Sequence, residues 1–151
     1  MAINTLKFSQ FVNGGALQSN NTIVGLKSSL NTAFTANTLE EFSWQTVTTT
    51  PFPMFGNNGY VPNNNSSMVQ FVLPVTSNFG DEIAISGMGS ALFRITQGAG
   101  QSIIISPNIT TVGVTGSVTS VNQYGSLRLV CIVANLTWTT TGGVQDIFTI
   151  V

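Results

Sequence analysis

Histidine is missing from this 151-residue chain, and charge is scarce, with four Lys or Arg and five Asp or Glu. Histidine is the commonest general acid or base in enzymes, so its absence argues against catalysis. The net charge is −1, and the cations are scattered along the chain at Lys7, Lys27, Arg94 and Arg128. Nucleic acids and anionic lipids both attract clusters of Lys and Arg. We therefore expect no nucleic-acid partner.

Long apolar runs are also lacking. No stretch reaches the length of a membrane-spanning helix, which predicts no membrane insertion. The residues from Met1 to Phe8 lack the basic and apolar segments of a signal peptide, which favours synthesis in a cytosol. Cys131 is the single cysteine, so no internal disulfide can form. It lies in the apolar run from Leu127 to Val133, where a buried structural thiol is expected.

Carboxylates are too few for most acid–base or metal chemistry. They are Glu40, Glu41, Asp81, Glu82 and Asp146. A glycosidase needs two carboxylates facing each other across a cleft, whereas neighbours along a strand point to opposite faces. Zinc requires clustered Cys and His, and calcium requires several carboxylates in one loop. The sequence therefore predicts no enzyme, no metal site and no cofactor.

The residues that replace charge favour a β fold. Val, Ile, Thr and Phe are abundant, and short apolar-polar alternations are separated by Gly, Pro and Asn turns from Phe42 onward. We expect about eight or nine strands: an all-β, antiparallel β-sandwich, jelly-roll-like, with a short N-terminal arm. Residues 1–41 form the extended arm, in which Ile23 to Thr32 fits a short strand or a turn of helix. Residues 42–151 form the sandwich head.

Two loops combine an aromatic ring with polar side chains, which is how proteins commonly hold sugars. Tyr60 precedes the Asn63-Asn64-Asn65 loop, and Tyr124 follows Asn122 and Gln123. The candidate ligand contacts are therefore Tyr60, Asn63, Asn122 and Tyr124. Ordinary loop aromatics are the alternative. Trp44 and Trp138 lie in alternating strand patterns, which favours packing in the core or an interface over ligand stacking.

Several short motifs resemble a known viral module in their order and spacing. They are Asn57-Asn58-Gly59-Tyr60, Phe71-Val72-Leu73-Pro74, Gly80-Asp81-Glu82-Ile83, Gln97 to Ile103, Thr110 to Ser117, and Leu129-Val130-Cys131 with Trp138. Together they resemble the head module of phage tail-fibre proteins and of collagen-like proteins from virophages and giant viruses. The opening segments Ile3 to Leu6, Phe8 to Gly15 and Val24 to Leu26 are similar to the start of prophage-encoded fibre proteins.

This resemblance implies a homotrimeric β-sandwich head displayed on a virion and made in the host cytoplasm. The leading hypothesis is a recognition module that contacts a host-surface receptor or glycan. No collagen-like segment separates the arm from the head, which favours a free-standing head attached to other virion proteins through residues 1–41. The alternative is a purely structural virion protein, such as a trimerisation cap, a capsid decoration or an assembly aid. A glycan-cleaving enzyme, the third hypothesis, requires Asp81, Glu82 or Asp146 to face another carboxylate.

Overall fold

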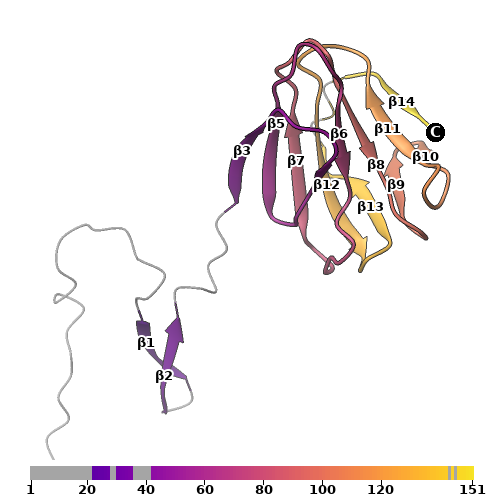
Figure 1. Ribbon diagram of the computed structural model, residues 1–151. Coiled ribbons are helices and arrows are strands. Elements are labelled where there is room, and N and C mark those ends of the chain that lie inside the picture. Colours follow the sequence, from indigo (N-terminus) through magenta and orange to yellow (C-terminus); the bar gives the residue numbers. More distant parts are fainter. Residues whose placement is uncertain (1–21, 28–29, 36–41, 143, 145) are drawn as a thin grey trace, which may run out of the picture. The chain divides into compact units, whose positions relative to one another are not determined.

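The computed structural model describes residues 22–27, 30–35, 42–142, 144 and 146–151. The chain divides into two compact units, Met1–Glu40 and Glu41–Val151 (Figure 1). In the first unit, β1 (Thr22–Lys27) pairs antiparallel with β2 (Leu30–Thr35). The described residues of the stretch that fitted either a short strand or a turn of helix, 23–27 and 30–32, are therefore strand. The remaining residues of the expected arm lie outside the described ones.

The second unit contains two facing sheets (Figure 1). The seven-stranded sheet has the order β10-β9-β13-β12-β7-β5-β3. Its strands are β3 (Ser43–Val47), β5 (Asn58–Pro62), β7 (Glu82–Ser86), β9 (Ser102–Ile105), β10 (Asn108–Ile109), β12 (Ser126–Val133) and β13 (Thr137–Thr140). The five-stranded sheet has the order β14-β11-β8-β6-β4. Its strands are β4 (Phe52–Pro53), β6 (Val69–Val72), β8 (Phe93–Thr96), β11 (Ser117–Ser120) and β14 (Phe148–Ile150).

The apolar core lies between the two sheets and follows from the alternation of apolar and polar residues. Val69 and Phe71 of β6 are buried while Gln70 between them is exposed, because successive side chains of a strand point to opposite faces. Phe71 meets Phe93 of β8 edge to face, with ring centroids 6.3 Å apart. Trp138 is the largest fully buried side chain, and Cys131 is buried. The expected all-β sandwich and the structural thiol are both confirmed.

The two sheets are mixed, so the expected antiparallel pairing holds for only part of the sandwich. Of the ten strand pairings in residues 42–151, five are antiparallel and five are parallel. From β3 to β8 the chain alternates between the two sheets, so spatial neighbours such as β5 and β7 are two strands apart in sequence. Parallel neighbours need a crossover connection. Here a strand of the opposite sheet forms part of each crossover.

The sequence also underestimated the number of strands. Residues 42–151 contain twelve strands, β3 to β14, where eight or nine were expected. The clearest omission is β5, which contains Tyr60, a residue that was expected in a loop. The stretch from Thr110 to Ser120 is a strand only at Ser117–Ser120. The described residues contain no helix, and therefore none long and apolar enough to cross a membrane.

Candidate functional site

One lateral row of side chains crosses the outer face of the seven-stranded sheet. In register, Trp44 of β3 lies beside Gly59 of β5, Gly59 beside Ala84 of β7, and Ala84 beside Arg128 of β12. Residues that pair in register share one face of a sheet. The row therefore places a large aromatic ring and a guanidinium group on either side of the two smallest residue types. The Trp44 ring lies over Gly59, so the lowest point of the row is Ala84, between that ring and Arg128.

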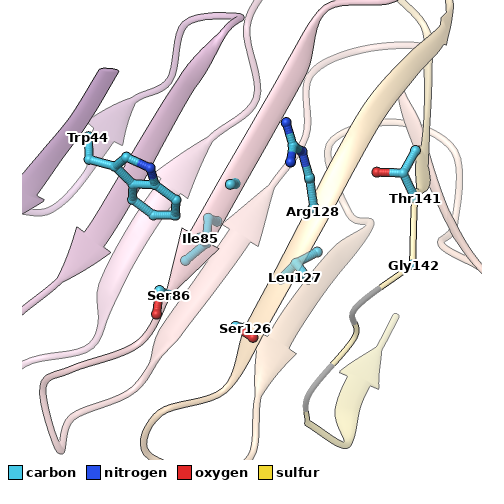
Figure 2. A pocket seen from close by; sticks show the side chains of 9 residues that line it. Trp44, Ile85, Ser86, Ser126, Leu127, Arg128, Thr141 and Gly142 are labelled. Carbon is cyan, nitrogen blue, oxygen red and sulfur yellow. The ribbon is translucent and has the colours of Figure 1, made fainter. Parts of the chain in front are cut away.

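Trp44 and Arg128 border an open groove of about 460 Å³. In Figure 2, Trp44 reaches from β3 toward the strand of Ile85, and Arg128 rises from β12 on the same face. Ser86 and Ser126 lie close together at one end of the view, because they pair directly across β7 and β12. The lining residues are Trp44, Ala84, Ile85, Ser86, Ser126, Leu127, Arg128, Thr141 and Gly142.

Trp44 is a surface platform, although the alternating pattern of its strand favoured packing in the core or an interface. A Cβ placed on Gly59 would overlap the indole atoms Cδ2, Cε3 and Cε2. The ring therefore lies over the bare backbone of β5, and 53% of the residue remains exposed. Phe42 meets the indole edge to face, with centroids 5.8 Å apart. An aromatic face that is supported from below and open above is suited to stacking a ligand.

Arg128 is held in place from two sides. Its Nη2 pairs with Oε2 of Glu82, and its guanidinium carbon lies 5.2 Å from the centroid of the Phe42 ring. The two charged side chains are 50% and 34% exposed, so the ion pair contributes only about 0–1 kcal/mol to stability. Its larger effect is local, because it fixes the guanidinium group and balances its charge beside the groove.

The described carboxylates do not form a facing pair. Glu82 pairs with Arg128. Oδ2 of Asp81 accepts a hydrogen bond of 2.8 Å from the backbone N–H of Asn78. Asp146 binds the Val121–Asn122 backbone beyond the other end of β7. The described residues contain no group of three or more His, Cys, Asp and Glu placed to hold a metal ion. Glu40 and Glu41 lie outside the described residues.

Tyr60 is not available to a ligand, which corrects one of the four candidate contacts. It is fully buried in β5. Its hydroxyl accepts a hydrogen bond of 2.7 Å from the Phe55 N–H and donates one of 3.2 Å to the Phe55 carbonyl. Burial raises the pKa of the Tyr60 phenol, against the opposing effect of the Phe55 backbone bond. The cause is the unexpected strand β5, which turns Tyr60 toward the core.

The other three candidates lie at one end of the sandwich. Tyr124 is 68% exposed with a φ of 69°, and Asn122 donates a 2.6 Å hydrogen bond from Nδ2 to Asp146. Asn63 is half-buried, and its N–H binds the Val47 carbonyl. Met88 connects the two loops. Its N–H binds the Pro62 carbonyl at 3.0 Å, and its carbonyl accepts 2.9 Å from Gln123 Nε2. The structure thus brings the Asn63 loop and the Asn122–Tyr124 loop together.

Sequence reasoning missed the groove itself. Trp44, Gly59 and Arg128 are distant in sequence, and only the strand register makes them neighbours. One signal was present, since a glycine inside a strand often marks the close approach of another group. That signal was hidden because the next residue, Tyr60, was expected to lie in a loop.

Comparison with known proteins adds no family. No protein-family model matches the chain, and no curated protein matches it.

Proposed function

We propose that this chain is a recognition module of the fibre-head type that binds a host-surface glycan in the groove. The observation that carries the proposal is the exposed indole of Trp44, supported on the bare backbone of Gly59 at the side of an open groove. A sugar ring offers one face of C–H groups and a rim of hydroxyls. Trp44 can cover the first, while Ser86, Ser126 and Thr141 offer hydroxyl groups to the second.

Assembly as a homotrimer on a virion belongs to the same proposal. It is supported by the resemblance of the sequence to viral fibre heads. It is also supported by apolar side chains at the end of the sandwich where β5 and β7 begin. Val75 is 84% exposed, Phe79 is 78% exposed and Phe55 is also exposed. Large exposed apolar patches commonly mark subunit interfaces.

Light scattering of the purified chain should give three times the monomer mass, and a monomer would contradict this part of the proposal.

Glycan binding is tested with a glycan array and three single variants. Trp44→Ala should weaken binding about tenfold or more, because a lost ring contact and its buried area are worth at least ~1.4 kcal/mol. Tyr124→Ala removes an exposed aromatic at the end loops, and Val114→Ala removes an exposed apolar side chain between β10 and β11. Both should bind as the wild type does. Loss of binding in Tyr124→Ala alone would move the site to the loops, and no binding by the wild-type chain would reject the function.

The alternative is a purely structural virion protein with no ligand. The exposed Val75 and Phe79 favour it, because an apolar end surface suits permanent assembly as well as it suits a receptor-binding trimer. The two functions differ in one outcome. Presence of the protein in purified particles, together with no binding to any glycan or to host cells, supports the structural role.

A further inference from the structure

The groove extends across the strands rather than along them. Thr141 continues the lateral row beyond Arg128, since its N–H donates 3.1 Å to the Arg128 carbonyl and Leu129 pairs with Thr140. From Trp44 to Thr141 the row therefore crosses four inter-strand intervals. At about 4.8 Å each, these give a length of ~19 Å. A single sugar ring covers only part of that distance.

The middle of the row is kept low. Gly59 has no side chain and lies beneath the Trp44 ring, and Ala84 has only a methyl group and is 7% exposed. Between the ring and Arg128 the floor of the groove is therefore Ala84, and a ligand stacked on Trp44 can continue over this methyl group toward Arg128 and Thr141. Ser86 and Ser126 flank this path on the same face, two residues along the strands from Ala84 and Arg128. The row thus offers an aromatic contact at one side and hydroxyl groups along its length.

The groove is also electrically balanced. Arg128 is the cation that lines it, and Glu82 already pairs with that cation. A carboxylated sugar would have to displace Glu82 or approach it at close range, and like charges at such distances repel. Arg94, the other cation of residues 42–142, belongs to β8 in the five-stranded sheet. The ion pair leaves Arg128 and Glu82 together without net charge beside the groove.

Resting on the proposed glycan-binding function, we infer that the groove takes an uncharged oligosaccharide segment laid across the strands. One sugar stacks on Trp44, and the following sugars extend past Ala84 and Arg128 toward Thr141. Glu82 is the residue that determines specificity for an uncharged ligand. It acts by neutralising Arg128, and it need not touch the ligand.

The test uses the full chain and an array of neutral, sialylated and uronic-acid-containing oligosaccharides, graded from monosaccharide to hexasaccharide. Affinity for neutral ligands should rise with length up to about the size that spans the row and then level off. Ala84→Val raises the floor between Trp44 and Arg128. It should reduce binding of long ligands about tenfold, while short ligands that contact Trp44 keep most of their affinity.

Charge selectivity is tested with Glu82→Gln. Removal of the balancing carboxylate should improve binding of acidic oligosaccharides about fivefold, the effect of one unscreened charge at contact distance in water. Neutral ligands should change little. Asp81→Asn is the matched control, because it removes the same charge from a side chain that binds the Asn78 turn. It should leave the selectivity unchanged.

The outcomes separate this inference from the function on which it rests. A wild-type preference for acidic glycans, or equal affinity for mono- and tetrasaccharides with Trp44→Ala still defective, would overturn the inference and keep the proposed function. Binding of no oligosaccharide at all would overturn both. Length-dependent binding of neutral ligands that Ala84→Val selectively weakens would support both.

Discussion

The indole ring of Trp44 lies against the backbone of Gly59, at the point where a side chain on residue 59 would have to be. The two residues pair in register across β3 and β5. The glycine thus determines both the height and the tilt of the aromatic platform. The relationship links a backbone feature of the fold to the surface on which the proposed ligand stacks.

Gly59→Ala should therefore act through Trp44. The added methyl group pushes the indole off the sheet, and binding of neutral oligosaccharides should fall about tenfold, as in Trp44→Ala. Stability should change by less than about 1 kcal/mol, because the displaced ring is at the surface and alanine suits a strand better than glycine does. Calorimetric titration and urea unfolding measure the two effects. In a double-mutant cycle, Gly59→Ala should cause no further loss of oligosaccharide affinity once Trp44 is alanine. Additive losses of affinity would refute the coupling between the two residues.

Trp138 offers the contrasting case of a buried tryptophan. It is fully buried, and its Nε1 has no hydrogen-bond partner among the described residues. Trp138→Ala should cost about 3–5 kcal/mol through the cavity it leaves. Trp138→Phe should cost roughly 2 kcal/mol or less, because it also removes a buried donor whose lack of a partner costs about 1–3 kcal/mol. Urea unfolding measures the loss of stability in each variant. A loss well above about 2 kcal/mol in Trp138→Phe would show that the indole N–H is satisfied in the folded protein.

Tyr60 should make stability sensitive to alkaline pH. Its pKa is raised above 10.0, chiefly by burial. The unfolded chain therefore ionises first, so this contribution is complete below pH 10 and is lost as pH rises through the folded-state pKa. Tyr60→Phe should cost about 1–2 kcal/mol at neutral pH by removing the bonds to Phe55. The gap between wild type and variant in urea unfolding should narrow above pH 10, and a constant gap would contradict this.

Asp146 should make the stability of the protein sensitive to acidic pH. Burial of its carboxylate alone would raise the pKa, but hydrogen bonds from the Asn122 side chain and from three backbone N–H groups outweigh burial and lower it below 3.8. Its contribution is therefore present above that value and is lost as pH falls through the folded-state pKa. Asp146→Asn should be less stable by about 0.5–1 kcal/mol at pH 7. In thermal unfolding the difference between wild type and variant should shrink as the pH falls below 3.8; an unchanged difference would show that it does not depend on the Asp146 charge.

Much of the sandwich could be predicted from the sequence because alternation reports directly which face of a strand is buried. The buried positions Ile83, Ile85, Leu127 and Leu129 follow that rule. Alternation does not encode the partner or the direction of a strand. The parallel pairing of β5 with β7 was therefore invisible, because the crossover between them runs through the opposite sheet.

The candidate site was harder to predict for the same reason. Trp44 and Arg128 lie 84 positions apart in the numbering, and only the registers of three strand pairs bring them to one face. Tyr60 shows the opposite failure. A local mixture of Gly, Asn and an aromatic looked like a ligand-binding loop, but the chain there is a central strand whose side chain supports the core. Local composition identified sugar-compatible residue types, and strand register determined which of them reach the surface.

The most direct test of the groove uses the two tryptophans of this chain, one exposed and one buried. Each gives a separate indole N–H signal in a proton–nitrogen NMR spectrum. On titration with a neutral tetrasaccharide that the array identifies, the Trp44 signal should shift in a saturable way while the Trp138 signal stays in place. The account is contradicted if the Trp44 signal does not move while the backbone signals of Asn122, Gln123 and Tyr124 shift instead.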